Sequence, residues 1–149
     1  MQATWPGHGS VGGVLVLEKR ILDGMVAGAL DGYPLEACGL LAGSVDEGGT
    51  ATVTAGYPAV NVAASARIYE VEPRALLQAD RKAEQAGVQL IGVYHSHTHT
   101  EGRPSPTDVA QAPDPDWHYV LVSLRDTHPS VRSWRIQDGK IREEPVVLQ

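Results

Sequence analysis

Residues 88–108 read VQLIGVYHSHTHTEGRPSPTD and contain the pattern His-x-His-x7-Ser-x2-Asp at His95, His97, Ser105 and Asp108. The apolar run at 88–93 predicts a β-strand. Because side chains alternate along a strand, His95 and His97 leave its end on the same side. Two imidazoles and a carboxylate brought back by the following loop supply three N/O ligands. This is the ligand count of a catalytic zinc site, whose fourth position stays open for water.

The segment from Ser105 to Asp108 also has a simpler interpretation. Ser at the N-cap, Pro at the first helical position and an acid three residues after the cap are typical of an ordinary helix start. That interpretation does not account for two histidines at the end of a strand, and Asp108 could begin a helix and bind metal at once. We favour a metal site once the upstream Glu36 is taken into account.

His-x-His-x7-Ser-x2-Asp with an upstream glutamate resembles the signature of the JAMM (MPN-plus) zinc metalloproteases, which cleave ubiquitin-like proteins at their C-terminal tails. The chain is also similar to a bacterial branch of this family, the hydrolases that release cysteine from the C-terminus of the sulfur-carrier protein CysO. The stretches that carry the likeness spread over nearly the whole chain: 36–39 (EACG), 94–98 (YHSHT), 104–105 (PS), 107–109 (TDV), 118–123 (HYVLVS) and 143–146 (EEPV).

This resemblance implies a fold, a cofactor and roles for the motif residues. The fold is an α/β domain with a mixed central β-sheet of the cytidine-deaminase-like kind, flanked by helices. His95, His97 and Asp108 would bind Zn²⁺, Glu36 would act as the general base, and Ser105 would help to hold the oxyanion. From its position alone, Glu36 would be expected to be an exposed carboxylate in a turn.

The resemblance also implies a partner, a small ubiquitin-like sulfur-carrier protein with a C-terminal Gly-Gly tail. We expect such a tail to lie extended beside the zinc and to pair with an exposed strand edge. Two alternatives stay open: cleavage of isopeptide bonds in conjugates of ubiquitin-like proteins, and a non-catalytic scaffold like the metal-free members of the family. The four intact motif positions argue against the scaffold.

The pattern of apolar residues predicts one α/β domain over residues 14–149, preceded by a flexible arm over 1–13, which holds four glycines. Helices are predicted at 19–31 and 73–86 and, briefly, from 105. In the second helix, Leu76, Ala79, Ala83 and Ala86 are expected to form the buried face. Strands mixed with helices indicate a sheet covered by helices, and the strands are predicted at 14–17, 37–45, 50–56, 68–71, 88–93, 119–124, 131–136 and 141–147.

Composition excludes several classes of function. The chain has 149 residues and a formal charge of −6, which argues against nucleic-acid binding by bulk electrostatics. A single cysteine rules out an internal disulfide and the P-C-x-x-C motif of the zinc deaminases. No early apolar run is long enough for a signal peptide or a membrane span, so we expect a cytoplasmic protein with no membrane contact.

The remaining residues with reactive or metal-binding side chains are less informative. Cys38 is expected to be a small buried residue in a strand rather than a nucleophile, because no Cys-His-Asn partners are identifiable. His99 is expected to be solvated or to help receive substrate. By resemblance, Asn61 and Tyr69 belong near the substrate tail. The other histidines are expected at the surface or at strand ends: His8, His118 and His128.

Overall fold

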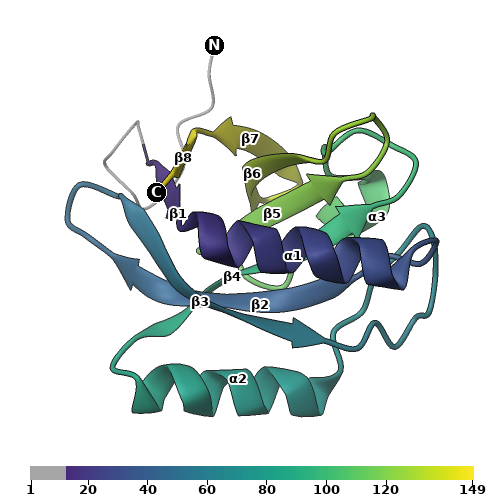
Figure 1. Ribbon diagram of the computed structural model, residues 1–149. Coiled ribbons are helices and arrows are strands. Elements are labelled where there is room, and N and C mark those ends of the chain that lie inside the picture. The colour runs from purple at the N-terminus through teal and green to yellow at the C-terminus, as the bar shows by residue number, and fades with distance from the viewer. Residues whose placement is uncertain (1–12) are drawn as a thin grey trace.

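A mixed β-sheet of eight strands forms the centre of the part of the chain that the computed structural model describes, residues 13–149 (Figure 1). The strands follow the order β7-β6-β5-β4-β2-β3-β1-β8 across the sheet. Their bounds are β1 (Leu15–Leu17), β2 (Cys38–Val45), β3 (Ala51–Ala59), β4 (Gln89–His97), β5 (His118–Ser123), β6 (Ser130–Gln137), β7 (Lys140–Glu144) and β8 (Val146–Leu148), and the helices are α1 (Lys19–Gly32), α2 (Pro73–Gln85) and α3 (Pro106–Ala110). The predicted α/β class, a mixed sheet flanked by helices, is confirmed.

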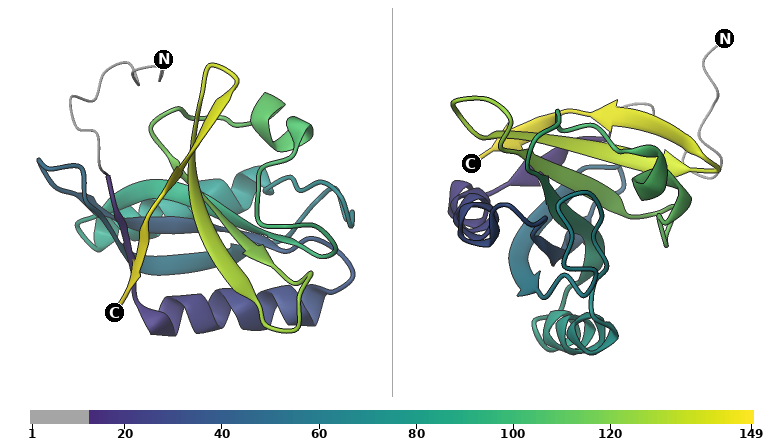
Figure 2. Two further views of the ribbon diagram at one scale, coloured as in Figure 1. Left: turned by 90° about the horizontal axis from the view of Figure 1, so that it is seen from above. Right: turned by 90° about the vertical axis from the view of Figure 1, so that its right-hand side faces the viewer.

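The two faces of the sheet carry separate apolar clusters because side chains alternate along each strand. Leu41, Tyr94 and Val120 pack with Met25 of α1 on one face. Leu40, Val93 and Leu121, their neighbours in sequence, pack with α2 on the other face. Two views at right angles show α1 and α2 on opposite sides of the central strands (Figure 2).

Strand β4, which carries the two motif histidines, lies in the middle of the sheet. It pairs antiparallel with β2 and parallel with β5. A Cβ atom built on Gly92 would lie 2.3 Å from the carbonyl oxygen of His118, so β4 and β5 approach at this point only because residue 92 is glycine. The strand also extends through His97, so both histidines belong to the strand itself rather than to the loop after it.

The predicted buried face of α2 is only half right. Pro73 occupies the start of the helix as expected, and Ala79 and Ala83 are buried. Leu76, however, is 39% exposed, and Ala86 lies outside the helix in an exposed position. The buried face of α2 therefore consists of two alanine side chains on successive turns, Ala79 and Ala83.

Two strand predictions were wrong. Residues 68–71 form no strand; the segment is extended, and a single bridge joins Asn61 to Val71. The predicted strand at 141–147 is two strands, because Pro145 has no N–H to continue the pairing with β6. After Pro145 the chain pairs with β1 as the parallel strand β8.

The predicted flexible arm over 1–13 falls outside the described residues except for Gly13, which is buried. The single domain predicted over 14–149 stays a prediction. Among the described residues, no helix is long and apolar enough to cross a membrane.

Candidate active site

His95 and His97 project from the same face of β4, and their Nε2 atoms lie 3.2 Å apart. Both imidazoles are buried. The Nδ1 atom of His97 lies 2.8 Å from the carbonyl oxygen of Glu101 and 3.0 Å from the Thr100 hydroxyl. Donation of the Nδ1–H to that carbonyl leaves the Nε2 lone pair of His97 directed toward His95, as is typical of a metal-binding histidine.

Asp108 completes a triangle with the two histidines. Its Oδ2 atom lies 3.2 Å from Nε2 of His95 and 3.1 Å from Nε2 of His97. Ligand atoms around a tetrahedral ion with bonds of 2.0–2.1 Å are separated by about 3.3 Å. The three described atoms are therefore close to the spacing that a bound zinc ion would impose, and the residues present fit the ion.

The start of α3 fixes the position of Asp108. The Ser105 hydroxyl accepts a hydrogen bond from the Asp108 N–H at 3.1 Å, and the Asp108 carboxylate accepts one from the Ser105 N–H at 2.9 Å. This reciprocal pair is a capping box. The helix-start interpretation of the motif is thus correct, and the same helix start brings Asp108 to the two histidines.

Glu36 lies in the turn between α1 and β2 and is only 4% exposed, so the expectation from position alone, an exposed turn carboxylate, was wrong. Its Oε1 atom lies 3.9 Å from Nε2 of His95 and is buried without a hydrogen-bond partner among the described residues. Glu36, His95 and His97 form a group whose N/O atoms could hold a metal ion. The Glu36 oxygen lies farther from Nε2 of His95, at 3.9 Å, than the Asp108 oxygen does, at 3.2 Å.

The pKa values in the site follow from burial and close contacts. Burial raises the pKa of Glu36 to about 7 and lowers that of His95 below its usual range. Burial alone would also raise the pKa of Asp108, but hydrogen bonds from His95 and His97 outweigh it and hold this pKa well below its ordinary value. Asp108 therefore stays ionised, while Glu36 can change protonation near neutral pH.

The segment 60–71 lies against the site, and only the resemblance of Asn61 and Tyr69 to family positions pointed to it. The Tyr69 ring stacks on the His95 ring, with centroids 4.1 Å apart and an interplanar angle of 19°. Asn61 donates to the carbonyl oxygens of Glu36 and Ile68 and accepts from the Glu70 N–H, each within 3.0 Å. The one side chain of Asn61 therefore links the backbone of Glu36 to the segment that carries Tyr69.

Ser96, between the two histidines, makes a hydrogen bond beside the site that the motif does not predict. Its side chain points to the other face of β4, and its hydroxyl accepts a hydrogen bond of 2.8 Å from the Ala37 N–H. This bond holds the turn of Glu36 against β4. The only signal in the sequence is the position of a small hydroxyl residue between two metal-binding candidates.

The structure also places the residues that sequence analysis left aside. Cys38 is buried, as predicted, and burial raises its pKa to about 11. His99 is exposed and contacts the Tyr33 hydroxyl, and His128 is exposed as predicted. His118 stands at the start of β5, as expected for a strand-end residue, and is buried there against Glu144. His8 lies outside the described residues.

Comparison with known proteins agrees with this fold and site. The model of the prokaryotic homologs of the JAB domain matches residues 18–137. The CysO-cysteine peptidase of Mycobacterium tuberculosis is 43% identical over 134 residues, which cover 89% of this chain and 90% of that protein. The probable TtuB-protein conjugate cleaving protease of Thermus thermophilus is 35% identical, over 91% of this chain and 84% of that protein.

A solved structure has the same fold. The solution structure of a protein from Desulfitobacterium hafniense superposes with a TM-score of 0.83 at 34% identity, covering 91% of this chain and 92% of that one. The fold and the buried cluster of histidines and carboxylates define a metallopeptidase of the JAMM type. The chain belongs to the prokaryotic JAB-domain family.

Proposed function

We propose that the protein is a zinc peptidase that hydrolyses the amide bond after the C-terminal Gly-Gly tail of a small ubiquitin-like sulfur-carrier protein and releases cysteine. The observation that carries the chemistry is the triangle of His95, His97 and Asp108 with the unpartnered carboxylate of Glu36 beside it. The likeness to the CysO-cysteine peptidase supports the choice of substrate.

In this proposal His95, His97 and Asp108 hold the zinc ion, which when bound would polarise the scissile carbonyl and lower the pKa of a water molecule to about 7. Glu36 accepts the proton of the attacking water and later gives it to the leaving amine. Its burial suits this role, because a carboxylate with a pKa near the working pH can both take and return a proton.

Ser105 has a second role in this proposal. Its hydroxyl accepts the Asp108 N–H, and a hydroxyl can donate its own hydrogen at the same time. We infer that this hydrogen stabilises the negative oxygen of the tetrahedral intermediate. The capping box would then hold a ligand and an oxyanion donor in a fixed relation.

A groove beside the site offers a place for the carrier's tail. It has a volume of about 420 Å³ and is lined by the segment 69–71 and by residues that include Leu40, Val93 and Trp117. Tyr69 joins the groove to His95, on which its ring stacks. The two edge strands of the sheet, β7 and β8, do not carry the site, so the expected strand edge is not available. We propose that the tail lies along the extended segment 68–71 instead.

The substrate is tested by incubating the zinc-loaded protein with a carrier-glycyl-cysteine adduct and, separately, with ubiquitin-like protein conjugates. Mass spectrometry should show loss of cysteine from the adduct and little cleavage of the conjugates. Glu36→Gln is the control: it should retain about one zinc per chain by elemental analysis and lose turnover. Rapid cleavage of conjugates with the adduct untouched would favour conjugate cleavage, the activity that the Thermus relative's name describes.

A further inference from the structure

The loop over residues 98–104 joins two parts of the candidate metal site. It leaves β4 after His97 and leads to the helix start that carries Asp108. Two of its residues, Gly102 and Pro104, are buried although they belong to a loop. A loop that packs against the sheet in this way turns backbone carbonyl oxygens away from water, and such groups need donors within the protein.

Two side chains of the sheet supply donors to this loop. The Ser123 hydroxyl donates to the carbonyl oxygen of Thr100 at 2.6 Å, and the indole N–H of Trp134 donates to that of Gly102 at 2.8 Å. Both donor residues are buried, with 3% of each exposed. Removal of either donor would leave a loop carbonyl without its partner, which costs free energy where water cannot replace the bond.

The strand register brings both donors to the face of the sheet that carries the motif histidines. Ser123 is the direct partner of His97 in the parallel pairing of β4 with β5. Trp134 is the partner of Tyr119 in the antiparallel pairing of β5 with β6. Paired residues, and alternate residues along a strand, face the same side of a sheet. The side chains of His97, Ser123 and Trp134 therefore project from one face.

The carbonyl group between the two anchored ones belongs to Glu101, and it orients His97. Its oxygen lies 2.8 Å from Nδ1 of His97. A metal-binding histidine keeps the orientation of its ring through the acceptor at its other nitrogen. Because the peptide groups on both sides of this acceptor are fixed by the sheet, the acceptor is fixed as well. Movement of the loop would turn the His97 ring and would also shift Asp108, since the loop joins the two.

We propose that Ser123 and Trp134 are positioning residues for metal binding, which set the zinc affinity of the site through the loop and not as ligands. The proposal rests on the zinc site of the proposed function and adds two residues that lie outside the His-x-His-x7-Ser-x2-Asp motif. Loss of a group that orients a metal ligand typically lowers metal affinity 10- to 100-fold.

The alternative is that both side chains only stabilise the fold. Trp134 belongs to the apolar cluster on the α2 face, and the guanidinium carbons of Arg103 and Arg132 lie 5.5 and 4.7 Å from the centroid of its ring. A purely structural role predicts that substitutions lower the stability of the metal-free protein and leave the zinc affinity of the folded protein unchanged. Stability and zinc affinity must therefore be measured separately.

The test measures the zinc dissociation constant of the full chain by competition with a coloured chelator, and the stability of each metal-free protein by urea unfolding. Ser123→Ala and Trp134→Phe each remove one donor, and the second substitution keeps an aromatic ring in the apolar cluster. Each variant should remain folded without metal and should bind zinc roughly tenfold more weakly than the wild type, or more weakly still.

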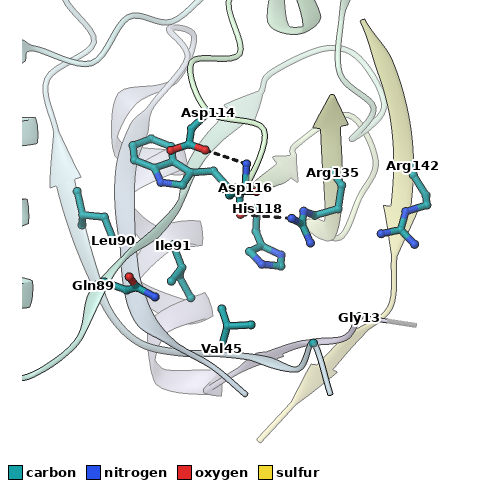
Figure 3. Close-up of a pocket in the computed structure, with 12 residues that line it drawn as sticks. Gly13, Val45, Gln89, Leu90, Ile91, Asp114, Asp116, His118, Arg135 and Arg142 are labelled. Atoms are coloured by element: carbon teal, nitrogen blue, oxygen red, sulfur yellow. Dashed lines mark hydrogen bonds between the residues drawn. The ribbon is translucent and has the colours of Figure 1, made fainter. Parts of the chain in front are cut away.

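Tyr119→Phe is the matched control, because it removes an aromatic donor from the strand partner of Trp134. The Tyr119 hydroxyl donates to the carbonyl oxygen of Asp114 at 2.6 Å, and Asp114 lines a separate pocket at the start of β4 and β5, away from the loop (Figure 3). This variant should bind zinc as tightly as the wild type, whatever its stability.

Unchanged zinc affinity in Ser123→Ala or Trp134→Phe, or an equal loss in Tyr119→Phe, would overturn the proposal and leave the zinc site of the proposed function in place. A wild-type protein that binds no zinc would overturn the proposed function and this inference with it. The two failures are therefore distinguishable.

Discussion

Burial raises the pKa of Glu36 to about 7 from its ordinary value of 4.5. Between these two pH values the unfolded chain binds fewer protons at residue 36 than the folded chain does. The contribution of Glu36 to stability is therefore fully present below pH 4.5 and is lost as the pH rises to 7. The buried Glu36 carboxylate thus lowers the stability of the metal-free protein at neutral pH.

Glu36→Gln should remove this pH dependence. At pH 8 we expect the metal-free variant to be more stable than the metal-free wild type by roughly 1–2 kcal/mol, and at pH 4 the difference should vanish. Urea unfolding of the two proteins at both pH values measures it. Glu47→Gln, at an exposed position in the β2–β3 turn, is the control and should show no such difference. Equal stability of Glu36→Gln and wild type at pH 8 would contradict the raised pKa.

Ser105 combines a structural and a proposed chemical role, and two substitutions separate them. Ser105→Ala should lower stability by about 1 kcal/mol through loss of the N-cap, and should slow turnover roughly 100- to 1000-fold through loss of an oxyanion donor. Ser105→Thr keeps the hydroxyl and should stay close to wild type in both. Thermal unfolding and steady-state kinetics provide the two measurements. A loss of stability without the kinetic loss would leave Ser105 as a cap only.

Close contact between elements depends on glycine at particular positions. Strand β4 can lie against β5 because Gly92 has no side chain, and β2 can lie against β3 because a Cβ on Gly43 would meet the Thr52 carbonyl oxygen at 1.9 Å. Gly28 in α1, in contrast, has open space around it. The same residue type is therefore required in the sheet and dispensable in the helix.

Gly92→Ala should destabilise the protein by roughly 1–3 kcal/mol or more, because the strands must separate to make room for the methyl group. Gly28→Ala is the matched control and should stabilise it by roughly 0.5–1 kcal/mol, since alanine is the better helix former and meets no neighbour. Denaturant unfolding of both variants gives the comparison. Similar effects of the two substitutions on the free energy of unfolding would show that the close approach of β4 to β5 does not require glycine at position 92.

In the whole molecule, the candidate metal site joins three segments that are distant in the sequence: the turn at Glu36, the end of β4 and the start of α3. Neither apolar cluster includes Glu36, His95, His97 or Asp108. The fold should therefore survive without metal, while bound metal should add stability through mass action.

Removal of metal with a chelator should lower the melting temperature by roughly 10 °C without loss of secondary structure. Restoring zinc should restore the melting temperature. His97→Ala should melt at the same temperature with and without zinc, because one of the three ligands is missing. Circular dichroism during heating measures all of these. Complete unfolding on chelation would show that the apolar core does not stabilise the fold without metal.

Local patterns in the sequence determined the class of fold and the ligand candidates. Strand alternation placed His95 and His97 on one side, and the turn formers placed α3 after the loop, because both signals depend only on neighbouring residues. The same local logic predicted strands at 68–71 and 141–147 and was wrong there, since pairing partners and Pro145 decide whether an extended segment joins a sheet.

Only the tertiary structure determined the environment of each side chain, that is, its burial and its contacts. The contact of Glu36 with His95, the stacking of Tyr69 on His95 and the link from Asn61 to Glu36 arise between residues that are 25 to 59 apart in the sequence. The pairing of Arg135 with Arg142, and of His118 with Glu144, depends on strand register and on packing against the next strand. A pKa or an unpaired donor is set by solvent exclusion, and the chain excludes solvent from these groups only once the sheet has formed.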